Sequence, residues 1–242
     1  MTKENVKPLE IFPAGGIEVG FSPMGPFLSL AGIIRSLNQD ILVHSMDLTV
    51  VADRDKSTYS MVWQAFKPHF LFQTAKEMVQ DQKREMSHPF LVQAHNPYRF
   101  NIVFHDLHAE KEVKEILRDY EHQWHKVVRT VMERRDHRAS GEVGENHLDL
   151  VTDFKKQDIC INSYTELNRK CYWEQGSYSL TLKINTEDAL ADQVCFFKFQ
   201  LEKHDASLLK TNCVSMLDEP IAELLGKTRP LFKTVLANYI PG

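Results

Sequence analysis

The chain has 242 residues, of which 43% are hydrophobic and 26% are charged, and its formal net charge is −4. This composition excludes a disordered chain, because it supplies enough apolar surface for a core of normal size in one large domain or two small ones. The slight negative charge provides no global attraction to nucleic acid or to an anionic membrane, so we expect neither as a partner.

The N-terminus and the cysteines bear on the compartment. Residues 1–5 lack the apolar core of a signal peptide, and apolar runs such as residues 194–197 are far shorter than the roughly 20 residues that span a bilayer. No pair of cysteines has the C-x-x-C spacing of a zinc ribbon. We therefore expect packed, reduced thiols in a soluble cytoplasmic protein. The cysteines are Cys160, Cys171, Cys195 and Cys213.

Residues 1–105 are predicted to form a strand-rich N-terminal half. Residues 41–52 alternate apolar and polar side chains, and after a short polar turn residues 59–66 return with aromatic and branched side chains. This arrangement predicts a β-hairpin. A capping-box pattern predicts a short helix over about residues 75–86.

Residues 106–138 are predicted to form one long amphipathic helix between two strand-rich halves. Asp106 is placed to cap its N-terminus, and Glu110 and Lys114 form a favourably oriented pair one turn apart. Apolar side chains recur at spacings of three and four and fall within roughly 120° of arc, which is typical of a helix with one buried face. They are Val113, Ile116, Leu117, Tyr120, Trp124, Val127, Val128 and Val131.

Residues 139–148 are small, polar and glycine-containing, which predicts a linker. Residues 149–242 then form a C-terminal half, and the sequence leaves open whether the two halves share one core. Two alternating runs separated by a polar loop predict an antiparallel pair of strands. The elements expected here are strands over residues 158–162, 178–185 and 195–202 and helices over residues 217–225 and 229–238.

These patterns predict a mainly β (α+β) fold of antiparallel, β-sandwich-like sheets with one long helix between them. The run from Gly32 to Val43, leading into residues 47–50, loosely resembles strands of arrestin-like or immunoglobulin-like sandwiches. That resemblance implies a sandwich scaffold and, by fold analogy alone, an adaptor role.

Two histidine pairs have the H-x-x-H spacing. His105 and His108 flank the predicted entrance of the helix together with Asp106, and such side chains can bind a transition metal. His122 lies fourteen residues beyond His108, about 21 Å along a helix, and both His122 and His125 point away from the apolar stripe. Any metal site is therefore predicted at His105, Asp106 and His108. The H-E-x-x-H motif of zinc proteases is absent.

Aromatic side chains are the second group of candidates. Trp63, Tyr172 and Trp173 are candidates to line a ligand pocket or an interface, because amphipathic rings suit both. Phe196 and Phe197 are consecutive in a predicted strand, so one of the two must be exposed or covered by another element.

Other motifs are missing or have a structural explanation. Basic residues gather over residues 129–138, where the helix dipole accounts for them, and no interleaved aromatic side chains follow to stack on bases. Phosphate-binding glycine motifs and the G-x-S-x-G elbow are absent. We therefore expect a non-enzymatic intracellular binding or interaction protein without a cofactor, whose partner is another protein or a second copy of itself. The alternatives are a metal-dependent enzyme with its site at the strand-to-helix junction and a small-ligand-binding protein with a pocket between the halves.

Overall fold

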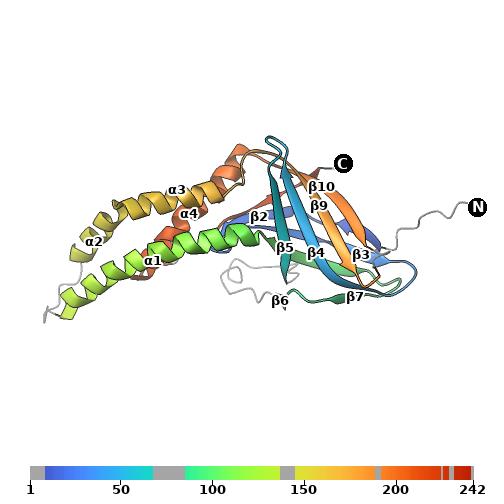
Figure 1. The fold of residues 1–242 in the computed structure, drawn as a ribbon, viewed down its shortest axis with the longest axis horizontal. Coiled ribbons are helices and arrows are strands. Elements are labelled where there is room, and N and C mark those ends of the chain that lie inside the picture. The colour runs from blue at the N-terminus through green and yellow to red at the C-terminus, as the bar shows by residue number, and fades with distance from the viewer. Residues whose placement is uncertain are drawn as a thin grey trace, which may run out of the picture.

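A computed structural model describes residues 9–67, 85–136, 145–188, 192–224, 226–228 and 232–240. It shows a mixed, strand-rich α+β fold in which a strongly curved antiparallel sheet occupies one end and four helices project from the other (Figure 1). The strands are β1 (Leu9–Pro13), β2 (Ile17–Ser22), β3 (Gly25–Ser36), β4 (Ile41–Ala52), β5 (Thr58–Phe66), β6 (Glu85–Met86), β7 (Phe90–Val92), β8 (Tyr98–His105), β9 (Gly176–Thr186), β10 (Gln193–Leu201), β11 (Thr234–Ala237) and β12 (Tyr239–Ile240). The helices are α1 (Leu107–Asp136), α2 (Glu145–Lys155), α3 (Asp158–Lys170) and α4 (Lys203–Leu224).

All the strands belong to one sheet, whose main path runs β11-β2-β3-β8-β5-β4-β9-β10-β12. The predicted hairpin of residues 41–52 and 59–66 is confirmed as β4 paired with β5, and the predicted antiparallel pair in the C-terminal half is confirmed as β9 and β10. Strands from both halves of the chain are neighbours, since β4 also pairs with β9 along almost its whole length.

The sheet is nearly closed by the last segment of the chain. β11 pairs with β2 at one edge, β12 pairs with β10 at the other, and Asn238 alone separates β11 from β12. We call this junction of β2, β11, β12 and β10 the closing seam. The fold is therefore barrel-like and not the predicted sandwich. Alternating side chains indicate that one face of a sheet is buried, but they do not indicate how far the sheet curves.

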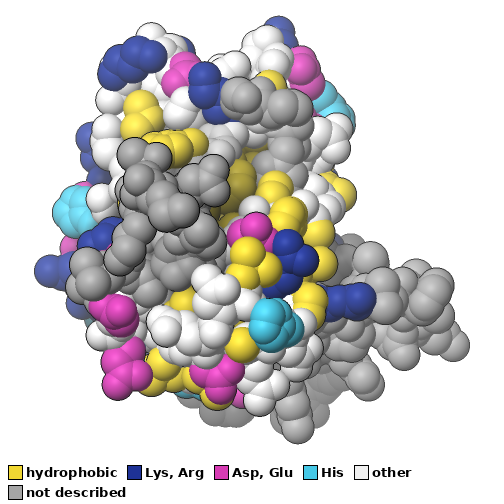
Figure 2. All heavy atoms as spheres, turned by 90° about the vertical axis from the view of Figure 1, so that its right-hand side faces the viewer, with side chains coloured by type: hydrophobic (Ala, Val, Ile, Leu, Met, Phe, Trp, Pro, Cys, Tyr) yellow, Lys and Arg dark blue, Asp and Glu magenta, His cyan; other side chains and the backbone are white. Residues whose placement is uncertain are grey.

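Inward-facing side chains of both halves form one continuous apolar core. Seen from the end remote from the helices, hydrophobic side chains gather at the centre of the face among charged and polar ones (Figure 2). Gly20 lets Phe27 lie across β2, because a Cβ at Gly20 would stand 2.1 Å from the Cζ atom of Phe27. The fully buried core residues include Val19, Phe21, Leu28, Leu30, Val50, Phe104, Leu182 and Phe199.

The predicted helix of residues 106–138 corresponds to α1, which has 30 residues, while residues 137–138 lie outside the described residues. It is not the one helix of the fold, because α2, α3 and α4 follow it in the half predicted to be rich in strands. α1 leaves the barrel, α2 and α3 return beside it, and α4 packs against α1 and α3 (Figure 1). Tyr120 and Trp124 of α1 are buried with their rings 5.4 Å and 5.2 Å from the ring of Phe154 on α2. The Tyr120 hydroxyl also donates to the Leu217 carbonyl of α4 at 2.9 Å. These contacts extend the apolar core of the barrel between the projecting helices.

Several predicted elements differ from the structure. Residues 158–162 were predicted as a strand but begin α3, whose buried residues Cys160, Ser163 and Leu167 follow helical spacing. Of the predicted helix over residues 217–225, residues 217–224 form the end of the longer α4, and residue 225 lies outside the described residues. The predicted helix over residues 229–238 is wrong at residues 234–237, which form β11. They pair with the edge of β2, whose backbone groups would otherwise lack hydrogen-bond partners in the sheet.

Parts of the predicted boundaries lie outside the described residues. Most of the predicted helix over residues 75–86 falls there, and its last two residues form β6. Of the predicted linker over residues 139–148, residues 145–148 begin α2 and the others are not described. Among the described helices, none combines the length and the apolar character needed to cross a membrane.

Candidate functional site

The junction between β8 and α1 brings part of the predicted metal site together. One carboxylate oxygen of Asp106, Oδ1, accepts the backbone N–H groups of His108 and Ala109, both at 3.0 Å. This confirms Asp106 as the N-cap of α1. Its other oxygen, Oδ2, accepts the hydroxyl of Tyr172 at 3.4 Å. The buried carboxylate therefore joins α1 to the segment that follows α3.

The two histidines of the junction lie in different surroundings. His105 is 1% exposed, and its Nδ1 atom is 3.4 Å from the Met24 carbonyl oxygen. The His108 side chain is exposed, and its Nε2 atom is 3.9 Å from a carboxylate oxygen of Glu112. In the described part of the chain, no three histidine, cysteine, aspartate or glutamate side chains gather closely enough to hold a metal. The geometry of this junction therefore gives no support to a metal centre.

The three aromatic candidates, Trp63, Tyr172 and Trp173, mainly pack and form hydrogen bonds within the fold. Trp63 and Trp173 are buried, and their indole N–H groups donate to the carbonyls of Ala65 at 3.2 Å and Gly20 at 2.9 Å. Tyr172 is half-buried and stacks on Tyr59 with ring centroids 3.6 Å apart. Burial and the neighbouring negative charge of Asp106 hold the pKa of the Tyr172 hydroxyl well above its usual range.

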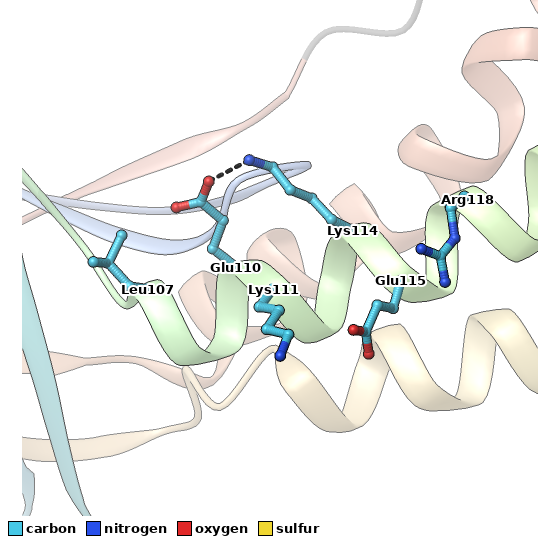
Figure 3. A pocket seen from close by; sticks show the side chains of 6 residues that line it. All are labelled: Leu107, Glu110, Lys111, Lys114, Glu115 and Arg118. Atoms are coloured by element: carbon cyan, nitrogen blue, oxygen red, sulfur yellow. Dashed lines mark hydrogen bonds and ion pairs between the residues drawn. The ribbon is translucent and has the colours of Figure 1, made fainter.

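A surface hollow of about 620 Å³ lies along the first turns of α1 (Figure 3). Glu110 and Lys114 form the ion pair that their spacing predicts, and this pair is the dashed line in Figure 3. Lys111 has no acidic partner among the described residues, and Leu107 adds an exposed apolar side chain. The hollow is lined by Leu107, Glu110, Lys111, Lys114, Glu115 and Arg118.

The cations of this hollow belong to a longer surface feature. Six basic or histidine side chains occupy one side of α1 at spacings of three and four, and all six are exposed. At about 100° per residue they fall within roughly 80° of arc, on the side of the helix away from the buried Val113, Tyr120 and Trp124. We call this feature the basic stripe. It consists of Lys111, Lys114, Arg118, His122, His125 and Arg129.

Acidic side chains are present around the basic stripe but neutralise it only partly. Glu110 is paired with Lys114, and Arg118 is 3.6 Å from Asp119 in a contact where both side chains are well exposed. Ion pairs as exposed as the second are weak, because water competes for both charges. For Arg129 the described residues likewise provide no acidic partner. The stripe is therefore a local positive surface on a chain whose net charge is −4.

The same helix is held in place from its other flank by an ion pair that is shorter and better shielded than the Arg118–Asp119 contact. The Lys170 ammonium of α3 lies 2.5 Å from the Glu112 carboxylate of α1. Its hydrogen bond and charge hold the pKa of Glu112 below the usual range. This contact fixes the start of α1 against the end of α3, so that the basic stripe faces outward.

Sequence reasoning located part of the basic stripe and missed its extent. It placed His122 and His125 on the solvent side, and the structure confirms that both are exposed. It attributed the cations near the end of the helix to the dipole and did not align them with Lys111 and Lys114 near the start. The signal was present, because the same spacing of three and four that identified the apolar face also connects the bases.

Comparison with models of known protein families, with curated proteins and with solved structures found no match for this chain.

Proposed function

We propose that this protein is a non-enzymatic binding protein that holds an acidic segment of a partner polypeptide along the basic stripe of α1. The observation that supports this proposal is the alignment of Lys111, Lys114, Arg118 and Arg129 with two histidines on one exposed side of a 30-residue helix. A carboxylate-rich segment laid along this side would meet Lys111, Lys114 and Arg118 near one end and Arg129 at the other. The two histidines between them can accept hydrogen bonds from, or donate them to, the same segment. Complementary charge of this kind favours encounter and sets orientation.

The dimensions of the stripe suit a short peptide segment. From Lys111 to Arg129 there are eighteen residues, about 27 Å of helix at 1.5 Å per residue. That length matches about five turns of a second helix or about eight residues of an extended chain. The hollow beside Leu107 lies at one end of this run and offers space for an apolar side chain of the same partner.

The composition of the surface favours a polypeptide over nucleic acid. The basic stripe contains no aromatic side chain on which a base could stack, and Glu115 lies on its margin. A nucleic acid carries its negative charges closely and evenly, about one per 1.7 Å of duplex, and would be repelled at each carboxylate. A peptide can place its acidic residues opposite the cations and a neutral or basic residue opposite Glu115.

The proposal can be tested with a fluorescently labelled polyglutamate peptide and the full-length protein. Fluorescence anisotropy should show binding that weakens as salt rises from roughly 50 to 200 mM, because the contacts are ionic and exposed. The test variant is Lys111→Glu/Arg118→Glu/Arg129→Glu, which reverses cations within the stripe. The control variant is Lys156→Glu/Lys203→Glu/Lys227→Glu, which makes the same change in net charge at exposed lysines elsewhere.

We expect the stripe variant to lose about tenfold or more in affinity, which corresponds to about 1.4 kcal/mol, and the control variant to bind nearly as tightly as the original protein. Equal losses in both variants would show that only net charge matters. A labelled single-stranded RNA that binds more tightly than the peptide, and depends on the same three residues, would replace the polypeptide with a nucleic acid.

A further inference from the structure

A second exposed surface lies on the outer side of the barrel next to the closing seam. Phe196 of β10 is 76% exposed, Val194 of the same strand is 46% exposed, and Ile240 of β12 is 38% exposed. Val194 and Phe196 share the outer side of β10 because they are two residues apart. Ile240 is directly opposite Lys198, the next outward residue of β10. The three apolar side chains are therefore neighbours on one outer surface.

The barrel itself does not account for Phe196. Its partner across the β9–β10 pair is Thr181, and the outward residues of β9 on either side of Thr181 are Ser179 and Lys183. The adjacent Phe197 points inward and packs against the core, so the core does not use the Phe196 ring. Together with Val194 and Ile240, this ring forms a contiguous exposed apolar group rimmed by polar residues, which is typical of a contact surface for another molecule.

Two lysines flank this apolar group. Lys183 is directly opposite Val194, and Lys198 is opposite both Ser179 and Ile240, so one lysine lies on each side of Phe196. Both lysines are exposed. Lys183 is opposite Asp47 of β4 on its far side from β10, whereas Lys198 is opposite no carboxylate in either neighbouring strand. We call Lys183, Val194, Phe196, Lys198 and Ile240 together the seam surface.

We propose that the seam surface binds a segment of a partner protein in which a large apolar side chain is flanked by carboxylates. The apolar side chain would cover Phe196, Val194 and Ile240, and the carboxylates would meet Lys183 and Lys198. This proposal does not depend on the basic stripe, which lies on a different element.

A second copy of the chain fits this surface less well. A twofold contact centred on Phe196 would bring Lys183 and Lys198 of one copy against the same two lysines of the other. Four like charges around an apolar centre oppose association, and juxtaposed like charges are a usual means of excluding a wrong partner. The charges thus favour an acidic partner over self-association.

The test uses two blocked nonapeptides with a central leucine and serine at most other positions. One carries glutamate two residues before and two residues after the leucine, and the other carries lysine at the same places. Titration of the isotope-labelled full-length protein, followed by amide chemical shifts, should show saturable changes with the glutamate peptide around residues 181–184 and 194–198. The lysine peptide should cause none there.

Phe196→Ser and Lys183→Glu should each weaken this binding about tenfold. Met86→Ser removes another strongly exposed apolar side chain, 72% exposed on β6, and should leave the binding unchanged. The stripe variant described above should also bind normally, which separates this proposal from the proposed function. Equal shifts with both peptides, or no saturable shift at these residues, would overturn the proposal. A dimer in sedimentation velocity that Phe196→Ser abolishes would assign the surface to a second copy instead.

Discussion

Replacing Asn212 by alanine should strongly destabilise the closing seam. Asn212 lies on α4 and is fully buried. Its Nδ2 atom donates to the Phe21 carbonyl at 2.9 Å and to the Lys233 carbonyl at 2.8 Å, and its Oδ1 atom accepts the Lys233 N–H at 2.8 Å. Phe21 belongs to β2, and Lys233 comes directly before β11. One side chain therefore joins α4 to both strands that meet at one side of the seam.

The magnitude follows from the groups that the substitution leaves behind. Alanine would leave the Phe21 carbonyl without this partner in a buried place, and the Lys233 carbonyl and N–H without it in a partly buried one. Each such group costs about 1–3 kcal/mol when buried and less where water reaches it. Allowing for some relaxation and for entry of water, we expect a loss of about 3–5 kcal/mol in the free energy of unfolding. Domains are commonly stable by only about 5–15 kcal/mol, so this is a large share of the total.

The measurement is urea unfolding followed by circular dichroism, together with amide hydrogen exchange. Asn212→Ala should lower the unfolding midpoint and speed exchange of the Lys233 amide. The control is Asn96→Ala, since Asn96 is exposed and, within the described residues, its side-chain amide donates only to the Gln93 side chain. This control should change stability by less than about 0.5 kcal/mol. If Asn212→Ala costs less than about 1 kcal/mol, or leaves Lys233 exchange unchanged, the three hydrogen bonds do not hold the seam as we reason.

Three further predictions concern packing and charge. Gly20→Ala should lower the free energy of unfolding by about 1–3 kcal/mol, because the new methyl group meets the Phe27 ring. In a double-mutant cycle by urea unfolding, Gly20→Ala/Phe27→Leu should lose less stability than the sum of the two single variants. Burial raises the pKa of Tyr172, so the stability that its neutral hydroxyl contributes is complete below the free tyrosine value of about 10 and is lost as pH rises through the folded-state pKa. As pH rises above about 10, the free energy of unfolding should therefore fall less in Tyr172→Phe than in the original protein. An equal fall in both proteins would contradict this reasoning. The pKa of Glu112 is lowered by Lys170, so the pair stabilises the fold above the free value of about 4.5 and ceases to do so as pH falls through the lowered pKa. Glu112→Gln should lower the free energy of unfolding by at most about 1 kcal/mol at neutral pH, because the pair is partly exposed, and should leave it unchanged in strong acid. A loss of stability that persists at low pH would mean that packing, not charge, is responsible.

Local sequence determined the elements whose signals lie within a few residues of one another. α1 follows from the spacing of Val113, Tyr120 and Trp124, and its start follows from the short carboxylate side chain of Asp106. The hairpin of β4 and β5 and the pair of β9 and β10 follow from alternation on either side of a polar turn. In each case the interacting groups are near neighbours in the chain, so the pattern contains the necessary information.

Short apolar runs were insufficient where two structures fit the same pattern. Residues 158–162 suit a strand when read alone, and only their continuation through Leu167 shows the helical period of α3. Residues 234–237 fit a helical spacing together with their neighbours, but their side chains are also alternately exposed and buried, as in a strand. The unpaired edge of β2 decides between these structures, since its backbone groups need partners that a helix could not supply.

The sequence by itself determined the long helix, the main hairpins and the exposed side on which His122 and His125 lie. The tertiary structure alone decided that the sheet curves into a nearly closed barrel, that Asn212 joins α4 to the closing strand, and that Phe196 and not Phe197 remains exposed. These outcomes depend on which distant segments meet. The curvature of a sheet and the partners of its edges are set by contacts between residues far apart in the chain, and no local period records them.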